Sequence, residues 1–281
     1  MEYKLLNLSQ NKYTQHFLKD IYVLTNASEH HIYGCVPNGE IGISVLLNGD
    51  GYIRLGNIWQ RQPPVSVYGL VSKVQFHQMA PGYREVNIGF LPEYLQLFIR
   101  ERVSGLLRRQ ATDLYDILPE VEVQRLFTGL LSAVNDNDIV HIVGAFLERN
   151  LLYEQVDKRA QYCLNLIRSG TATNVDSLSQ DMKISSTTLR HIFHHHVGIT
   201  PKELIKILRV KTALLRQNIT EENMTQTAYS LGYYDQSHFI HEFKEAVGLP
   251  PKQYFMSQEL TFDFYNFQRW RYDSFAGLRI E

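Results

Sequence analysis

The sequence predicts an α+β protein: a β-rich N-terminal domain with a helical hairpin, then an all-α domain of two helix-turn-helix units joined by a long helix. Three observations predict this class. Residues 1–95 hold short β-branched segments between turn sequences, residues 96–155 have helical periodicity, and residues 185–254 contain one pattern twice. With 281 residues, 44% of them hydrophobic, the chain is long enough for two domains with separate cores.

Turn sequences divide the first 95 residues into short strands. Ile41 to Leu47 is β-branched and apolar, Asn48-Gly49-Asp50-Gly51 is a strong hairpin sequence, and Tyr52 to Leu55 is the predicted return strand. Pro81-Gly82 separates the strand-like segments 71–79 and 83–90. Short strands at this spacing favour a small barrel or sandwich.

Helices are predicted between this domain and the repeat. An amphipathic segment runs from Tyr94 to Leu107, and a helix with an apolar stripe begins after Pro119. Asn135 to Asp138 ends that helix, and a second one carries apolar residues from Ile139 to Leu147. Such stripes need a partner, and two are open: the β-rich domain as the default, or a second copy of the chain.

The repeat organises the C-terminal half. Phe193 to Lys202 is matched by Phe243 to Lys252 at a constant offset of 50 residues, and Leu189 matches Phe239 at the same offset. Two copies are too few for a solenoid, so the repeat indicates two like helical subdomains.

Each copy is predicted to be a helix-turn-helix. In the first, 175–182 is a short helix, and Ser185 caps a second helix that runs to Val197. In the second, 225–231 is the short helix, and Asp235 caps the next one. The sequence from Thr200 to Glu203 is a capping box with Pro at the first helical position, and it opens a long joining helix to about residue 217.

These residues resemble the AraC/XylS family of bacterial transcription regulators. The resemblance covers residues 159–257 and is carried by Leu178 to Pro201 and by Ala228 to Tyr254, which includes Gly-Tyr-Tyr-Asp-Gln-Ser-His-Phe. Ser179 and Lys183 depart from the family pattern, in which Ala and Gly are usual at these places. The family implies a seven-helix module whose two recognition helices read successive major grooves of duplex DNA about 34 Å apart.

On this resemblance, the polar faces of the second helices are expected to contact DNA. Small and basic polar side chains suit the major groove, whose base edges offer acceptors to Arg and amide groups. The residues expected to contact bases are Thr187, Arg190, His191, Gln236, Ser237 and His241. Those expected to contact phosphates are Ser185, His194, Lys202, Arg209, Lys211, Lys244 and Lys252, with bracing of the joining helix as the alternative for Arg209.

The N-terminal part has a weaker resemblance to the cupin-like sensor domains that precede such modules. It is carried by 36–40, 68–70 and 88–92. The sensor is therefore expected to bind an organic effector, or to be a structural remnant. The candidate pocket residues are Tyr33, Tyr52, Trp59, Tyr68 and Phe76, each of which can equally fill the core.

No metal or other cofactor is expected. A metal-dependent cupin needs two histidines one residue apart, whereas His30 and His31 are adjacent and His77 stands alone. The histidines at 194–196 cannot converge on one ion, because successive helical side chains point about 100° apart.

Charge and cysteines narrow the functional classes. Residues 161–256 carry ten Lys and Arg against eight Asp and Glu, a net charge of +2, and residues 1–160 carry a net charge of −2. A slightly basic domain fits modest affinity for nucleic acid. A DNA-repair methyl acceptor needs a cysteine in a basic setting, which neither Cys35 nor Cys163 has. We therefore expect no enzymatic activity; a helical adaptor that binds no DNA is the other alternative.

The resulting prediction is a sequence-specific DNA-binding transcription regulator, controlled by a small ligand or by dimerisation through its N-terminal domain. The predicted domains are a cupin-like sensor (1–95), a helical linker and candidate dimerisation segment (96–155), the DNA-binding domain (156–257) and an aromatic extension (258–281). Duplex DNA is the expected partner, and RNA polymerase, a second copy and a small-molecule effector are further candidates. A polar N-terminus and the lack of a long apolar run predict a cytoplasmic protein without a membrane span. Seven aromatic residues between Phe262 and Phe275 predict that the extension packs on its own chain or on a partner.

Overall fold

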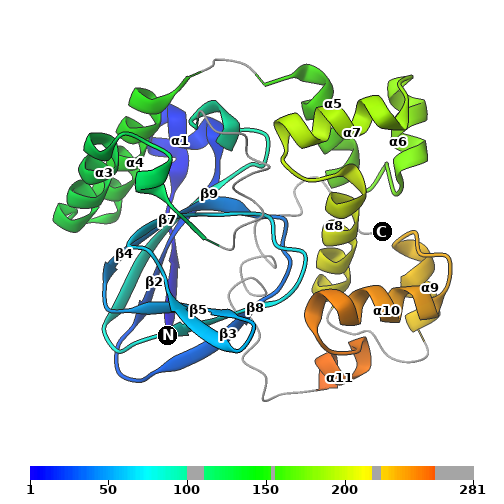
Figure 1. The fold of residues 1–281 in the computed structure, drawn as a ribbon, viewed down its shortest axis with the longest axis horizontal. Helices are drawn as coiled ribbons and strands as arrows, with labels where there is room; N and C mark the ends of the chain where they lie inside the picture. The colour runs from blue at the N-terminus through cyan, green and yellow to red at the C-terminus, as the bar shows by residue number, and fades with distance from the viewer. Residues whose placement is uncertain (100–110, 153–155, 217–222, 257–281) are drawn as a thin grey trace.

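A computed structural model describes residues 1–99, 111–152, 156–216 and 223–256, and it places a β-sheet domain beside a helical domain (Figure 1). The described strands pair antiparallel in two sheets, of order β1-β2-β9-β4-β7-β10 and β3-β8-β5-β6. Their bounds are β1 Glu2–Leu5, β2 Leu18–Asn26, β3 His31–Cys35, β4 Ile41–Asn48, β5 Gly51–Leu55, β6 Ile58–Arg61, β7 Val65–Tyr68, β8 Gln75–Met79, β9 Tyr83–Phe90 and β10 Thr112–Asp113.

Two glycine turns carry the chain from one sheet to the other. The hairpin predicted at 48–51 is wrong, because β4 pairs with β7 and β9, whereas β5 pairs with β6 and β8. The turns instead pack on each other: Asn48 Nδ2 donates to the carbonyl oxygen of Gly82 at 2.7 Å, and a Cβ on Gly49 would lie 2.8 Å from Tyr83 Cα. Both glycines have positive φ, which glycine adopts without strain.

Helices from two parts of the chain pack against the larger sheet. α1 (Lys12–Phe17), α3 (Glu120–Ser132) and α4 (Asp136–Asn150) lie together beside it (Figure 1). Most apolar residues of α3 and α4 are buried in the core of this chain, as in the default interpretation, but Leu131 and Val134 of the predicted stripe are exposed. Within the described ranges, 3₁₀ turns occur at Leu8–Gln10, Leu95–Leu97 and Leu114–Asp116. The turn at Leu95–Leu97 replaces the start of the helix expected over 94–107, and residues 100–107 lie outside the described ranges.

The helical domain contains both predicted helix-turn-helix units. Its helices are α5 Lys158–Arg168, α6 Val175–Met182, α7 Ser186–His196, α8 Pro201–Leu215, α9 Met224–Ser230, α10 Gln236–Val247 and α11 Pro251–Met256. The caps form as expected: Ser185 accepts from the Thr188 amide, Asp235 accepts from the His238 amide, and Thr200 and Glu203 form the capping box of α8. None of the helices in the described ranges has the length and apolar character of a membrane span.

The two units belong to different cores. Phe193 of the first unit lies in a core that continues into the sheet domain. Phe239 and Phe243 of the second unit lie in a separate core, to which the sheet domain contributes Val36. The second unit is therefore the more independent of the two, and the aromatic extension, residues 258–281, lies outside the described part of the chain.

Candidate functional site

Helix α7 exposes a polar face opposite its buried residues. Leu189, Ile192 and Phe193 are buried, whereas the outward residues project from the opposite side. The exposed set comprises Ser185, Thr187, Arg190, His191 and His194, all of which sequence analysis selected. His196 turns the other way, where its Nδ1 lies 3.1 Å from Gln96 Oε1 of the sheet domain.

Helix α10 presents the matching face of the second unit. Ser237, His241 and Lys244 are exposed, as are the predicted phosphate contacts Lys202 and Lys252. Gln236 is less exposed than these residues, and its side-chain oxygen accepts a hydrogen bond from Thr225 Oγ1 at 2.9 Å.

Sequence analysis missed one exposed aromatic residue beside this face. Tyr234 is 85% exposed and directly precedes the Asp235 cap of α10. The neighbouring Tyr233 is buried, and its hydroxyl donates to Glu242 at 2.8 Å. The position of Tyr234 next to the helix start was the available signal, but a Tyr-Tyr pair does not reveal which ring is outside.

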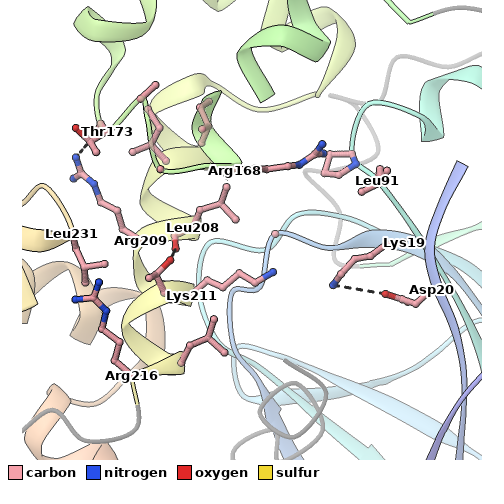
Figure 2. Close-up of a pocket in the computed structure, with 18 of the residues that line it drawn as sticks. Lys19, Asp20, Leu91, Arg168, Thr173, Leu208, Arg209, Lys211, Arg216 and Leu231 are labelled. Carbon is pink, nitrogen blue, oxygen red and sulfur yellow. Dashed lines mark hydrogen bonds and ion pairs between the residues drawn. The ribbon is translucent and has the colours of Figure 1, made fainter. Parts of the chain in front are cut away.

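Two predicted phosphate contacts require correction. The Arg209 guanidinium donates to the carbonyl oxygen of Thr173 and lies 5.0 Å from the centre of the Tyr233 ring, so it braces the joining helix. Lys211 lines a cavity between the two domains. The two side chains leave α8 in opposite directions, Arg209 toward Thr173 and Lys211 toward Lys19 of the sheet domain (Figure 2). We remove both from the proposed DNA contacts.

This interdomain cavity has a volume of about 540 Å³. Apolar side chains dominate its wall, and basic side chains reach it from both domains. Figure 2 shows the amines of Lys19 and Lys211 directed toward each other from β2 and α8. The apolar wall residues include Leu5, Leu6, Leu8, Leu91, Ile167, Ala172, Ile205, Leu208, Leu215 and Leu231, and the basic ones are Lys19, Arg168, Arg209, Lys211 and Arg216.

The arginines of the cavity are held by neighbouring groups. Arg168 makes a two-pronged ion pair with Glu93, and Arg216 donates to Ser230 Oγ at 2.5 Å. Lys19 pairs with Glu40 and lies 3.7 Å from Asp20. Burial, and then the positive charge of Lys19, lowers the pKa of Lys211 well below its usual value. An anion in the cavity would therefore favour the charged form of Lys211.

A second, smaller chamber lies inside the sheet domain, with a volume of about 90 Å³. Of the predicted pocket residues, Tyr33 and Tyr68 line it. Tyr52, Trp59 and Phe76 do not, because strand register places them on the opposite face of the smaller sheet from Tyr33, His77 and Ile53.

The chamber has a polar network. Glu85 accepts from Ser44, from Gln62 at 2.7 Å and from Asn87 at 2.8 Å. His77 stacks on Tyr33 with ring centres 5.2 Å apart, and burial lowers the His77 pKa to about 4. His77 is therefore neutral at physiological pH.

The cysteines give no support to the methyl-acceptor alternative. Cys163 is buried in α5, and burial, with the charge of Asp157 as a smaller cause, raises its pKa to about 11. A thiol with a raised pKa is a poor nucleophile at neutral pH. Cys35 is half-buried at the wall of the small chamber.

Two helix-turn-helix units with exposed polar and basic faces on their second helices define a DNA-binding protein of the helix-turn-helix class. Residues 178–257 match the family model of a helix-turn-helix domain. A helix-turn-helix transcriptional regulator of Haemophilus influenzae is 25% identical over 86% of this chain and 79% of its own length. The regulator MtrA of Neisseria gonorrhoeae is 24% identical over 48% of this chain and 49% of its own, and the activator RhaS of Escherichia fergusonii is 25% identical over 63% and 61%.

Among solved structures, ToxT of Vibrio cholerae with a bound unsaturated fatty acid has a TM-score of 0.43 and 14% identity, over 83% of this chain and 94% of that one. Residues 178–257 therefore carry a helix-turn-helix domain, and the chain is similar over most of its length to helix-turn-helix transcriptional regulators.

Proposed function

We propose that α7 and α10 enter two adjacent major grooves of one duplex. The supporting observation is that both helices bury one face and expose another made of polar and basic side chains. The 15-residue helix α8, about 22 Å long, joins the units as a rigid spacer. In this proposal residues 156–257 are the DNA-binding domain and residues 1–95 the sensor.

The proposed contacts follow the exposed faces. We assign base contacts to Thr187, Arg190, His191, Gln236, Ser237 and His241. We assign phosphate contacts to Ser185, His194, Lys202, Lys244 and Lys252. Hydroxyl-radical footprinting on a bound duplex tests the arrangement: two protected patches about one helical turn apart, on one face, are expected, and a single patch contradicts it.

We propose that an apolar anion controls this activity from the interdomain cavity. A ligand with a carboxylate head and a hydrocarbon body matches the two facing lysines and the apolar wall. The cavity volume lies within the range of small-molecule sites, roughly 300–1,000 Å³. Because the site lies between the domains, a ligand there contacts both the sensor and the joining helix.

Calorimetric titration with sodium oleate tests this site. Lys19→Ala and Lys211→Ala should each weaken oleate binding about tenfold or more, because a charged hydrogen bond in a sheltered site contributes roughly 1.5–3 kcal/mol. Lys158→Ala, an exposed lysine on α5, is the matched control and should bind as the parent does. Equal affinity for oleyl alcohol, which lacks the charge, would show that the lysines do not select an anion.

A second copy of the chain is proposed as a partner of the sensor. The observation that favours it is a set of exposed apolar residues on and after α3: Val121 is 54%, Leu131 48% and Val134 89% exposed. Sedimentation velocity should show a dimer that Leu131→Asp converts to monomer; a monomeric parent chain contradicts the proposal.

A further inference from the structure

The short segment 36–40, between β3 and β4, contacts both the cavity and the second helix-turn-helix unit. At its start, Val36 is 3% exposed and lies in the core that contains Phe239 and Phe243. At its end, the Glu40 carboxylate pairs with Lys19, which lines the cavity. Five residues therefore join a cavity lysine to the core behind α10.

Close packing limits independent movement of this segment. Gly39 has φ +72°, and a Cβ there would lie 3.0 Å from Leu208 Cδ2 of α8. The Asn38 side chain accepts a hydrogen bond from the Glu40 amide at 2.9 Å. Asn38 and Glu40 are both buried, so neither side chain can move without displacing the atoms packed around it.

A neighbouring contact ties the sheet domain to the same unit. The Val74 amide donates to the carbonyl oxygen of Ala246, in the last turn of α10, at 2.7 Å. Lys73 lies 3.8 Å from Glu245 of that helix. The sheet domain therefore holds α10 at its C-terminal end, opposite the end that begins at the Asp235 cap.

We infer that residues 36–40 form a coupling segment, through which occupation of the cavity sets the position of the second helix-turn-helix unit. The inference rests on the proposed effector site. An anion that binds Lys19 competes with Glu40 for the same amine, and a buried carboxylate that loses its partner must rearrange. The first unit shares its core with the sheet domain, so the second unit is the part that responds.

Hydrogen exchange of the ligand-free full chain tests whether residues 36–40 support the second helix-turn-helix unit, independently of any ligand. Val36→Ala should speed amide exchange in α9 and α10 about threefold or more and leave α6 and α7 unchanged, because local opening is governed by local packing. Ile32→Ala, four residues earlier and 48% exposed, is the matched control and should change neither unit. Equal effects on both units, or no effect of Val36→Ala on α10, would overturn the inference.

Hydrogen exchange measured in the presence of sodium oleate tests the coupling to the cavity. In the parent chain, oleate should change exchange in α9 and α10, and Val36→Ala should reduce this change at least about twofold while oleate affinity is retained. A full response in Val36→Ala contradicts the coupling segment. Failure of oleate to bind contradicts the effector site instead, and the ligand-free comparison still decides whether 36–40 positions the second unit.

Discussion

The side chain of Arg190 is exposed and belongs to neither hydrophobic core of the helical domain. It is exposed on α7, one turn beyond the Ser185 cap, while Leu189 and Ile192 on either side of its helical face are buried. Lys211 is the opposite case, since its charge lies in a cavity where burial works against it. At the scale of residues, exposure therefore separates side chains available to DNA from those available to an effector.

Replacement of Arg190 by Ala should weaken binding to the preferred duplex by about 1–3 kcal/mol, because Arg pairs bidentately with guanine. The loss should be concentrated at one base pair, and nonspecific affinity should fall little. Fluorescence anisotropy with the preferred duplex and its single-base variants measures this. Equal weakening on all sequences would make Arg190 a phosphate contact.

His77 should make the β-sheet domain sensitive to acid. Its pKa is about 4 in the folded chain, below the value of 6.5 for an unburied histidine. The unfolded chain therefore binds a proton in a range where the folded chain does not, so stability is full above pH 6.5 and falls between pH 6.5 and 4. Melting temperatures across this window should fall less in His77→Gln than in the parent, and parallel curves would contradict the assignment.

At the scale of elements, the turns of the two helix-turn-helix units differ in backbone strain. Lys183 closes α6 in the left-handed region (φ 53°), where Gly232 performs the same task after α9 (φ 76°). Only glycine adopts this region without penalty. The departure from the family pattern at Lys183 therefore leaves the turn intact and costs some stability.

Lys183→Gly should raise the free energy of unfolding by about 1 kcal/mol, because the left-handed penalty is removed. Gly232→Ala is the reciprocal variant and should lower it, since an added Cβ would also lie 3.1 Å from Thr173 Cβ. Urea denaturation of both variants gives the comparison. Destabilisation by Lys183→Gly would show that the lysine side chain holds the turn.

The helices of the two helix-turn-helix units could be predicted because their caps and apolar spacings depend only on residues near in sequence. Ser185, Asp235 and the capping box at Thr200 each set a helix start within a few residues of sequence. The passage of the chain from one sheet to the other at Asn48 and the inward direction of Lys211 both depend on residues far away in the chain. No local sequence pattern therefore predicts them. The interdomain cavity escaped prediction for the same reason.

At the scale of the molecule, polar contacts and a continuous core join the β-sheet domain to the first helix-turn-helix unit. Arg168 of α5 pairs with the buried Glu93, and His196 Nδ1 of α7 lies 3.1 Å from Gln96 Oε1. The two domains are therefore in direct contact beside the cavity, and residues of both line it.

The salt dependence of DNA affinity should separate surface lysines from cavity lysines. Lys202→Ala should reduce the log–log slope by about 0.9, as expected for one lost phosphate contact. Lys211→Met should leave the slope unchanged in the absence of ligand, because its amine faces the cavity. A reduced slope for Lys211→Met would return Lys211 to the DNA contacts.

Selection of bound duplexes from a random pool tests most directly the claim that both units read DNA. We expect an enriched motif of two parts, centred about 10–10.5 base pairs apart, with Arg190→Ala losing preference in one part and His241→Ala in the other. Enrichment of a single short motif that both variants alter alike, or no enrichment at all, would contradict it.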